Sequence, residues 1–320
     1  MSIDLGIVIV NWNVRDLLAA CLDSVYAELA ASATTLSGVV CVVDNGSRDG
    51  SVEMLRSHFP RTRLIQADNR GMGAGNNLGL RLLAAEYSPA AYMILNPDTI
   101  VRPGALRHLV GWLRTRPPAG VVAPKLLNPN GTLQHSGFRY PGLVQLAWDL
   151  FPPPRPWQWL RDSPCNGRYP PWAYATSAPP FQVEHTLGAA FVVRDLALAQ
   201  CGLFDEAFYL YCEEIDWQWR LCRAGWECWI VPQAEIVHYG GQSTTQTGAT
   251  ALFHLWRSRH LLYHRYHRPL TNLLAGWLVR YALRRRIYAY HQPHSRGLPP
   301  SEQRAQLTRV LTEIIHLWQS

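Results

Sequence analysis

The sequence LGIVIVNWN at residues 5–13 is a β-branched apolar run that stops abruptly at polar residues, and VVCVVDNGS at residues 39–47 repeats the pattern. Runs of this composition and length predict buried strands. Between them, apolar residues at helical spacing predict a crossover helix with one buried face: Leu17, Leu18, Cys21, Leu22 and Val25. A strand, a helix and a second strand in this order predict a parallel sheet.

Two further strand-like runs, at residues 63–67 and 92–95, extend the alternation. Ligands of such sheets gather beyond the carboxyl ends of the strands. Compact polar residues follow each predicted strand, namely Asn11 and Asn13, Asp44 and Asn45, Asn69 and Gly71, and Asn96 and Asp98. Turn and helix-cap chemistry would explain each pair by itself. Their succession along the chain instead predicts a binding surface at one edge of the sheet.

The chain of 320 residues, 48% of them apolar, is long enough for one large α/β domain with an appendage. We expect this domain over residues 1–245, with an insertion over residues 150–182 where Pro, Trp and Tyr replace periodic patterns. A lid over the site and a packed structural loop both fit this composition.

Later strands are expected at residues 189–193 and 227–231, the second ending at a Pro232 turn.

Residues 246–320 are expected to form a helical appendage, with helix breaks at Pro269 and around residues 293–300. The formal net charge of +7 and the pI near 9.2 indicate an anionic partner. Most of the positive surplus lies in this appendage rather than in the α/β domain. We therefore expect phosphorylated substrates or an anionic membrane surface as partners, and no nucleic acid.

One predicted helix of the appendage carries an apolar face followed by three arginines at residues 284–286. The face consists of Leu270, Leu273, Leu274, Trp277, Leu278 and Tyr281. It could serve as a peripheral membrane anchor, which would suit a lipid-linked acceptor. Packing onto the α/β domain or onto the second copy in a homodimer is the alternative.

The cysteine pattern favours a reducing compartment. The 7 cysteines are odd in number, scattered and never spaced as Cys-x-x-Cys, so neither a disulfide framework nor a zinc ribbon is indicated. The N-terminus lacks a signal-peptide pattern. No uncharged apolar run approaches the roughly 18 residues that cross a bilayer. We expect a cytoplasmic protein, with peripheral attachment to the inner face of the cytoplasmic membrane left open.

Asp98 follows an apolar strand and is placed to coordinate a hard divalent cation. Asn96 offers a neutral oxygen beside it, and Pro97 stiffens the turn. A proline turn with an aspartate helix cap is the structural alternative. His238 could complete the metal shell or touch a diphosphate, although a single histidine is also compatible with a purely structural role.

Three acids crowd one turn of a predicted helix, namely Glu213, Glu214 and Asp216. Neighbouring carboxylates repel one another, which raises a pKa and suits a general base. The alternative is a helix N-terminus at which acids meet the macrodipole and Glu213 or Asp216 pairs with Arg220 or Arg223. Both interpretations can hold for different members of the cluster.

The glycine-rich stretch at residues 69–79 opens a helix and lets the backbone approach a ligand closely. Its glycines miss the G-x-G-x-x-G spacing, and the first strand ends in Asn-Trp-Asn where a dinucleotide-binding fold would place glycines. The stretch therefore predicts close backbone contact with a ligand, but it is not a dinucleotide fingerprint.

In order and spacing, these motifs resemble family 2 of the glycosyltransferases, which has the GT-A fold, and especially its rhamnosyltransferase-like bacterial branch. The resemblance covers roughly residues 3–245. It rests on IVNWN at 9–13, VDNGSRDG at 43–50, NRGMGAGNN at 69–77, LNPDT at 95–99, GLFDE at 202–206, the acidic cluster and the Val-His pair at 237–238.

On the donor side, the resemblance implies that Asp44 contacts the base of a nucleotide. It also implies that Asn11, Asn13 and Asn77 help to line the pocket of the nucleotide-sugar. The remaining strand-end residues are expected around this pocket, namely Asn45, Asn69, Gly71, Asn96 and Asp98.

At the reacting end, the resemblance implies that Asp98 binds Mg²⁺ or Mn²⁺ bridging the diphosphate, with His238 close to the ion. Gly188 and Ala189 would lie beside the acceptor subsite. Glu214 matches the position of the catalytic base of the family. Such enzymes invert the anomeric centre by a single displacement.

The sequence departs from the family pattern at two positions. Relatives often carry Asp where this chain has Glu214, so Glu213 or Asp216 is an alternative base. Many relatives have Asp-x-Asp where this chain has Asn96-Pro97-Asp98, and the loss of one anionic ligand should weaken metal affinity.

Our primary hypothesis is an inverting transferase that moves a sugar from a dTDP- or UDP-sugar, with dTDP-rhamnose the best single guess, to a hydroxyl of a glycan or lipid-linked acceptor. Such an enzyme would serve cell-envelope polysaccharide synthesis. A catalytically silent protein that binds nucleotide-sugars or glycans at the membrane is the alternative. A nucleotidyltransferase on a similar fold is a third hypothesis.

Overall fold

A computed structural model describes residues 3–152, 154–241, 248–292 and 301–319 of the chain. The chain divides into two compact units. The first comprises Met1–Tyr140, Arg168–Tyr209 and Glu213–Ser243, and the second comprises Pro141–Gly167, Leu210–Cys212 and Thr244–Ser320. The segment expected as one insertion at residues 150–182 is thus shared between the units, and the expected domain boundary near residue 245 stays a proposal.

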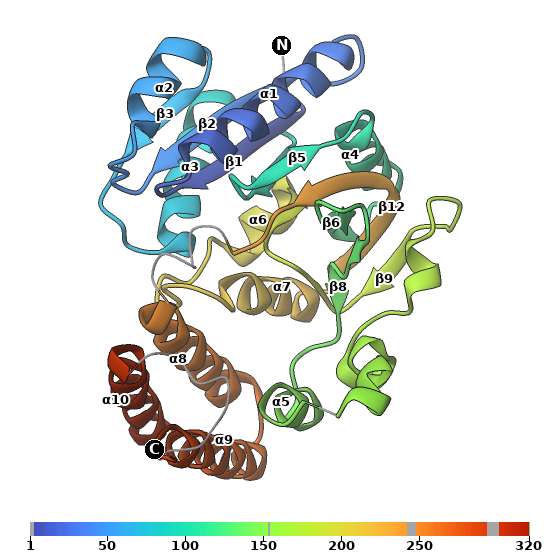
Figure 1. Cartoon of the computed structure of the whole chain (residues 1–320). Helices are drawn as coiled ribbons and strands as arrows, with labels where there is room; N and C mark the ends of the chain where they lie inside the picture. Colours follow the sequence, from blue (N-terminus) through green and yellow to red (C-terminus); the bar gives the residue numbers. More distant parts are fainter. Residues whose placement is uncertain (1–2, 153, 242–247, 293–300, 320) are drawn as a thin grey trace. The chain divides into compact units, whose positions relative to one another are not determined.

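The first unit is built on one mixed sheet with the strand order β3-β2-β1-β4-β11-β6-β12-β5 (Figure 1). Strands β7 and β9 extend it by pairing with β6 and β12. Pairing is parallel among β1, β2, β3 and β4 and between β6 and β12, whereas β5 and β11 run antiparallel to their neighbours. The expected α/β fold with a mostly parallel central sheet and C-terminal helices is confirmed.

The strands of this sheet have the bounds β1 Leu5–Asn11, β2 Gly38–Asp44, β3 Arg63–Gln66, β4 Ala91–Leu95, β5 Thr99–Val101, β6 Ala119–Leu127, β7 Leu133–Gln134, β9 Phe181–Val183, β11 Ala190–Arg194 and β12 Glu227–His238. A small second sheet pairs β8 Gly137–Phe138 with β10 His185–Thr186. The helices of this unit are α1 Arg15–Ala31, α2 Ser51–His58, α3 Met72–Tyr87, α4 Ala105–Thr115, the 3₁₀ helix η3 Pro171–Tyr174, α6 Asp195–Cys201 and α7 Glu213–Arg223.

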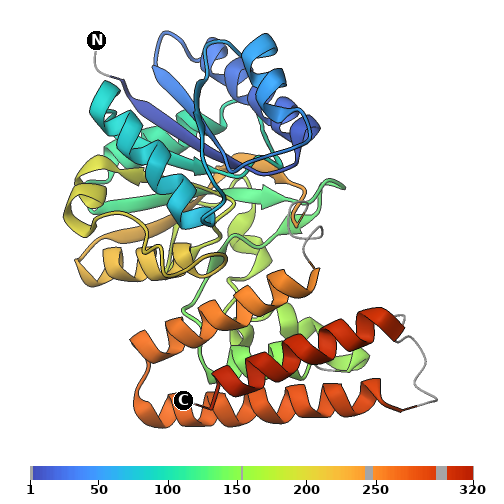
Figure 2. The ribbon, with the colours of Figure 1, turned by 90° about the vertical axis from the view of Figure 1, so that its left-hand side faces the viewer.

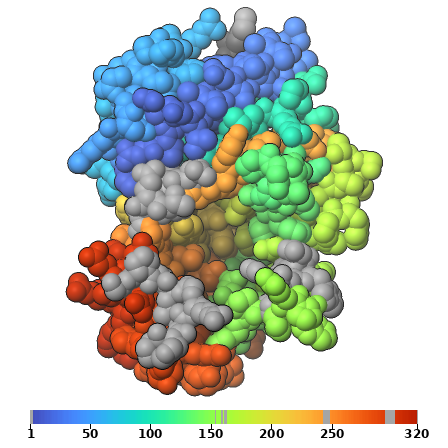
Figure 3. Space-filling view, viewed as in Figure 1, coloured from blue at the N-terminus to red at the C-terminus, as the bar shows by residue number. Residues whose placement is uncertain are grey.

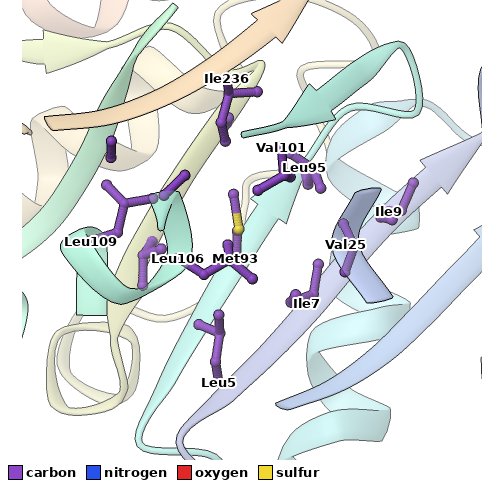
Figure 4. Packing of buried hydrophobic residues seen from close by; sticks show 14 of the residues in the cluster. Leu5, Ile7, Ile9, Val25, Met93, Leu95, Val101, Leu106, Leu109 and Ile236 are labelled. Carbon is purple, nitrogen blue, oxygen red and sulfur yellow. The ribbon is translucent and has the colours of Figure 1, made fainter. Parts of the chain in front are cut away.

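Both faces of the sheet are buried, because the side chains of each central strand alternate between two hydrophobic clusters. In β1, Ile7 and Ile9 pack with α1 and α4 on one face, as the residues labelled in Figure 4 show. Val8 and Val10 pack with α3, α6 and α7 on the other face. A strand buried on both faces must be apolar along its length, which explains the unbroken run that opens the sequence.

The predicted turn at Pro232 is wrong, because β12 continues through the proline to His238. The strand has an irregularity between Val231 and Glu235, where its register against β6 shifts. Proline has no N–H to donate to a ladder, and a bulge removes the need for that hydrogen bond. The continued strand pairs with β5 and carries His238 to the sheet edge opposite Thr99.

The second unit is helical (Figure 2). Its elements are α5 Leu143–Leu150, the 3₁₀ helices η1 Arg155–Asp162 and η2 Pro164–Asn166, α8 Gly248–Tyr266, α9 Pro269–Tyr290 and α10 Ser301–Leu317. Trp256, Val279 and Leu311 contribute to one core shared by α8, α9 and α10. The helix break predicted at Pro269 is confirmed, and the break predicted around residues 293–300 lies outside the described residues.

Candidate functional site

The polar residues that follow the predicted strands converge at one edge of the sheet. Asn11 pairs with Asp44 at the ends of β1 and β2, and β4 lies on the other side of β1. The antiparallel strands β11 and β5 begin at this same edge, where Ala190 pairs with Leu95. His238 ends β12 there, opposite the first residue of β5. Strand topology therefore brings together residues that are far apart in the sequence.

A buried polar cluster closes the ends of β1 and β2. The Asn11 side-chain amide donates to Asp44 Oδ2 at 2.9 Å and to Ser47 Oγ at 3.1 Å. The backbone N–H of Ser47 donates to Asp44 Oδ1 at 2.9 Å, so both carboxylate oxygens have protein partners. Ser47 Oγ also accepts from the backbone N–H of Asn13 at 3.0 Å. Ser47 was missed at the sequence level, where its only signal was its place in the Asp-Asn-Gly-Ser run.

The glycine-rich loop is held by Asn69 and Asn45. Asn69 Oδ1 accepts from the Gly71 N–H at 3.1 Å, and Asn45 Nδ2 donates to the Gly71 carbonyl at 3.4 Å. Gly71 has φ +99°, and a Cβ atom there would lie 2.1 Å from the carbonyl oxygen of Tyr209. Met72 N–H donates to that same oxygen at 3.0 Å and begins α3. Glycine at this position is therefore required by close backbone packing.

Asn77 lies in α3 with its whole amide engaged by the loop after α6. Its Nδ2 donates to the Phe204 carbonyl and to Glu206 Oε1, both at 3.0 Å, and its Oδ1 accepts from Phe204 N–H at 3.0 Å. The side chain is almost completely buried. These contacts hold the loop against α3, and a direct contact of Asn77 with a donor stays a prediction.

Asp98 and His238 face each other at the sheet edge, with 3.4 Å between His238 Nε2 and Asp98 Oδ1. Both residues are buried, and the Tyr239 N–H donates to the Asp98 carbonyl at 2.9 Å. His238 Nδ1 contacts Gln134 Oε1 at 2.7 Å, whereas Nε2 has no hydrogen-bond partner among the described residues. The helix cap considered for Asp98 is not formed, because the strand β5 follows it.

This pair fits a divalent cation. A buried ring nitrogen without a partner beside a carboxylate oxygen is a combination that a cation between them would satisfy. Among the described residues, no group of three or more His, Cys, Asp or Glu side chains is arranged to hold a metal ion. Further ligands would then come from phosphate oxygens, water or neutral oxygens, as is usual for Mg²⁺.

Gly188 and Ala189 connect this turn to the acidic helix. The Ala189 carbonyl accepts from the Asn96 N–H at 2.8 Å. A Cβ atom on Gly188 would lie 3.1 Å from Glu214 Cγ, so the backbone passes directly over that side chain. Gln218, which the sequence did not single out, fixes this approach through its amide, which bonds the Thr186 backbone at 2.7 and 3.1 Å.

The three acids at the start of α7 have different environments. Asp216 is completely buried and pairs with Arg220 at 3.0 Å, and the guanidinium also donates to the carbonyls of Cys201 and Leu203. This is the helix ion pair considered at the sequence level, and it gives Asp216 a structural role. Glu213 and Glu214 each have a solvent-inaccessible Oε2 without a hydrogen-bond partner among the described side chains.

Burial raises the pKa of both glutamates. For Glu213, the charge of Glu214 adds to the effect of burial and raises the pKa well above its usual range. Burial raises the pKa of Glu214 to about 7, although backbone N–H groups, including that of Gly188, oppose the increase. A carboxylate that titrates near neutral pH is suited to accept a proton from a reacting hydroxyl.

Residues 6–137 match the sequence profile of "Glycosyl transferase family 2". The chain is 28% identical over 246 residues to the N-acetylglucosaminyl-diphospho-decaprenol L-rhamnosyltransferase of Mycobacterium tuberculosis, covering 74% of this chain and 76% of that protein. It is 23% identical over 299 residues to the low-salt glycan biosynthesis hexosyltransferase Agl10 of Haloferax volcanii, covering 86% and 83% of the two chains.

Solved structures of similar fold are GT-A glycosyltransferases. The mannosyltransferase PcManGT from Pyrobaculum calidifontis, in complex with GDP-Man and Mn²⁺, superimposes with a TM-score of 0.56 at 16% identity, over 99% of this chain and 86% of that one. GalNAc-T7 with UDP, GalNAc and Mn²⁺ gives 0.57 at 14% identity, over 98% and 56%. The described chain therefore has the GT-A fold.

The close packing at Gly71 predicts a specific loss of stability. We expect Gly71→Ala to lower the free energy of unfolding more than Gly131→Ala, as measured by chemical denaturation. Both glycines have positive φ, but a Cβ atom at Gly131 would meet nothing within 4 Å. The backbone strain is about 1 kcal/mol at either position, and the clash at Gly71 adds roughly 1–3 kcal/mol. Equal losses would contradict the described loop.

The raised pKa of Glu214 predicts a pH-dependent gain in stability for Glu214→Gln. The proton on Glu214 stabilises the folded state fully at pH values below 4.5, the pKa of this group in the unfolded chain. This stabilisation is lost as the pH rises through about 7, its pKa in the folded chain. Glu214→Gln should therefore melt higher than the wild type at pH 8, by roughly 2–4 °C per kcal/mol of relieved penalty, and nearly equal to it at pH 4.5. Glu53→Gln, on the exposed face of α2, is the control. A pH-independent difference would contradict the burial of this carboxylate.

Proposed function

We propose that this chain is a family 2 glycosyltransferase that transfers a sugar from a nucleoside diphosphate donor to an acceptor hydroxyl with inversion of the anomeric centre. The observation that carries the proposal is the convergence of three polar groups at one sheet edge. They are the Asn11–Asp44 cluster, the Asp98–His238 pair and Glu214. The segment Gly188–Ala189 links the second group to the third.

For the donor we propose a nucleotide bound with its base at Asp44, and dTDP-rhamnose, with UDP-sugars next, as the sugar nucleotide. The name of the Mycobacterium tuberculosis relative, an L-rhamnosyltransferase, supports rhamnose at 28% identity. Asn11 and Ser47 keep the Asp44 carboxylate in place by occupying both its oxygens from the protein side. Each carboxylate oxygen has a further lone pair with which it can accept from a base.

For the cofactor we propose Mg²⁺ or Mn²⁺, held by Asp98 and His238. The two similar solved enzymes contain Mn²⁺. When bound, the ion would neutralise charge on the leaving diphosphate. Asn96 is neutral at a position where a second carboxylate could bind the ion. The protein therefore supplies little negative charge, and its affinity for the ion should depend on the phosphates of the donor.

For the chemistry we propose Glu214 as the base. Its carboxylate takes the proton of the acceptor hydroxyl while the hydroxyl oxygen forms a bond to the anomeric carbon and the bond from that carbon to the diphosphate oxygen breaks. The Gly188 backbone lies against the Glu214 side chain, and its N–H favours the ionised carboxylate. Glu213, whose pKa is raised well above its usual range by burial and by the charge of Glu214, is the alternative base.

For the acceptor we propose a hydroxyl of a glycan carried on a lipid diphosphate. The acceptor named for the Mycobacterium tuberculosis relative is of this kind. A lipid-linked acceptor places the reaction at a membrane surface. Among the described residues, no helix combines the length and the apolar character that crossing a bilayer requires.

We further propose that α9 docks on an anionic membrane surface. One stripe of this helix exposes large apolar side chains, whose exposed fractions are 67% for Leu270, 64% for Leu273, 57% for Trp277, 49% for Tyr281 and 68% for Tyr288. The exposed Arg284 and Arg285 continue the stripe, and no acidic residue occurs in α9. Aromatic and basic residues on one exposed face are typical of helices that lie in the membrane interface.

The proposed chemistry is tested by release of nucleoside diphosphate from dTDP-rhamnose and UDP-sugars with Mn²⁺ and a lipid-diphosphate glycan. We expect Asp98→Ala and Glu214→Gln to reduce turnover by roughly 10²–10⁴-fold, and Glu53→Gln to leave it unchanged. Wild-type turnover should rise with pH through about 7, because Glu214 must be ionised. Unchanged turnover in both site variants would exclude these roles, and donor binding without turnover on any acceptor would support a silent binding protein.

The membrane proposal is tested by co-sedimentation with phosphatidylglycerol vesicles. We expect the double variant Leu273→Ser, Trp277→Ser to lose binding, and Arg284→Gln to weaken it by about 1 kcal/mol, or roughly fivefold. Trp172→Ser is the matched control, because Trp172 is 75% exposed on the other unit. Concentration-dependent dimers that the double variant abolishes, without vesicle binding in the wild type, would instead identify α9 as a homodimer interface.

A further inference from the structure

Gln134 lies against His238 although the two residues are separated by 104 positions in the sequence. Gln134 ends β7, which pairs with β6 on the side opposite β12. Leu126 of β6 pairs with Gln134 on one side and with Ile236 of β12 on the other. Gln134 therefore lies level with Ile236, near the end of β12, with only β6 between them. Figure 3 shows the green hairpin of β6 and β7 beside the orange end of β12. The 2.7 Å contact between Gln134 Oε1 and His238 Nδ1 crosses this short distance.

Backbone groups determine the orientation of the amides behind this contact. The Leu133 carbonyl can only accept, and it contacts the Nδ2 of Asn128 at 3.3 Å. The Asn128 amide therefore has its nitrogen toward Leu133 and its Oδ1 toward Gln134. Gln134 Nε2 donates to this Oδ1 at 3.2 Å. A reversed Gln134 amide would place two oxygens against each other.

A second backbone group gives the same orientation independently. The Thr132 N–H can only donate, and it contacts Asn130 Oδ1 at 3.1 Å. The Thr132 hydroxyl donates to that same oxygen at 2.6 Å, so its own oxygen is free to accept from Asn128 Nδ2 at 3.0 Å. Both routes leave Gln134 Oε1, an acceptor, facing His238.

His238 Nδ1 must therefore carry a proton, since the oxygen opposite it cannot donate. In the neutral ring this leaves Nε2 with its lone pair, directed toward Asp98 at 3.4 Å and without a hydrogen-bond partner in the described chain. The Nε2 lone pair and the Asp98 carboxylate repel each other unless a cation lies between them. An outer hydrogen bond that orients a histidine ligand typically strengthens metal binding by 10–100-fold.

We propose that Gln134, oriented by Asn128, is a positioning residue that holds His238 in the Nδ1–H tautomer and so keeps Nε2 available to a divalent cation shared with Asp98. This inference rests on the metal site of the proposed function. Without Gln134, the ring can adopt the Nε2–H tautomer and donate to Asp98 Oδ1, which is already within 3.4 Å. The metal would then have to displace a proton from its own ligand.

The tautomer is measured directly in metal-free protein by long-range ¹H–¹⁵N NMR of the histidine rings at pH 8. The His238 signals are assigned by their absence from His238→Gln. We expect protonated Nδ1 and unprotonated Nε2 in the wild type, a shift toward Nε2–H in Gln134→Met, and the wild-type pattern in Gln134→Glu, which retains an acceptor. A wild-type ring with the proton on Nε2 overturns the proposal.

Metal affinity is measured on the same variants by calorimetric titration with Mn²⁺ in the presence of UDP or dTDP. We expect Gln134→Met to bind roughly 10–100-fold more weakly than the wild type, Gln134→Glu to remain within a few-fold, and Gln182→Met, on the exposed position of β9, to match the wild type. Wild-type affinity in Gln134→Met overturns the proposal. Equal melting temperatures of Gln134→Met and Gln182→Met exclude a general loss of folding.

The two measurements separate this inference from the metal site on which it rests. If Asp98→Ala and His238→Ala bind Mn²⁺ as the wild type does, the metal site is elsewhere and the metal part of the proposed function fails. A tautomer that still depends on Gln134 would then leave the orientation of His238 intact. If both ligand variants lose Mn²⁺ and Gln134→Met does not, the metal site stands and the positioning role fails.

Discussion

The parallel pairing of β1 with β2 and β4 is the constraint on which the rest of the structure depends. Helices cover both faces of these strands, so polar side chains cannot be placed along them and occur where the strands end. Because parallel strands end at the same edge, Asn11 and Asp44 become neighbours although α1 separates them. Every other element of the site is positioned relative to this edge.

The acidic end of α7 carries carboxylates whose ionisation destabilises the folded state. The buried Asp216 pairs with Arg220, whose guanidinium also donates to carbonyls of the segment after α6 and so connects that segment to the helix. With the helix anchored in this way, Glu213 and Glu214 each keep a solvent-inaccessible carboxylate oxygen without a comparable partner, and the folded state bears the unfavourable energy of their ionisation. A group suited to accept a proton near neutral pH is therefore a destabilising group as well, as is common at functional sites.

Most of the first unit could be predicted because its signals are local. The strands β1, β2, β3 and β4 are short β-branched or apolar runs, and the order of their polar ends follows directly from the chain. The extent of β12 was not predictable in the same way, since Pro232 reads locally as a stop and only the register shift against β6 lets the strand continue. Likewise, the hydrogen bonds by which Asn77 holds the loop at Phe204 and Glu206 were not predictable, since they join residues 127 and 129 positions apart.

The sequence by itself determined the alternation of strands and helices, the polar character of the strand ends and the family to which the motifs point, because period, branching and turn chemistry act between residues close in the chain. Only the tertiary structure decided which acid is neutralised by Arg220, which carboxylate lies under Gly188, and which nitrogen of His238 faces Asp98. Those outcomes depend on burial and on hydrogen bonds between residues as far as 104 positions apart, and no local pattern encodes them.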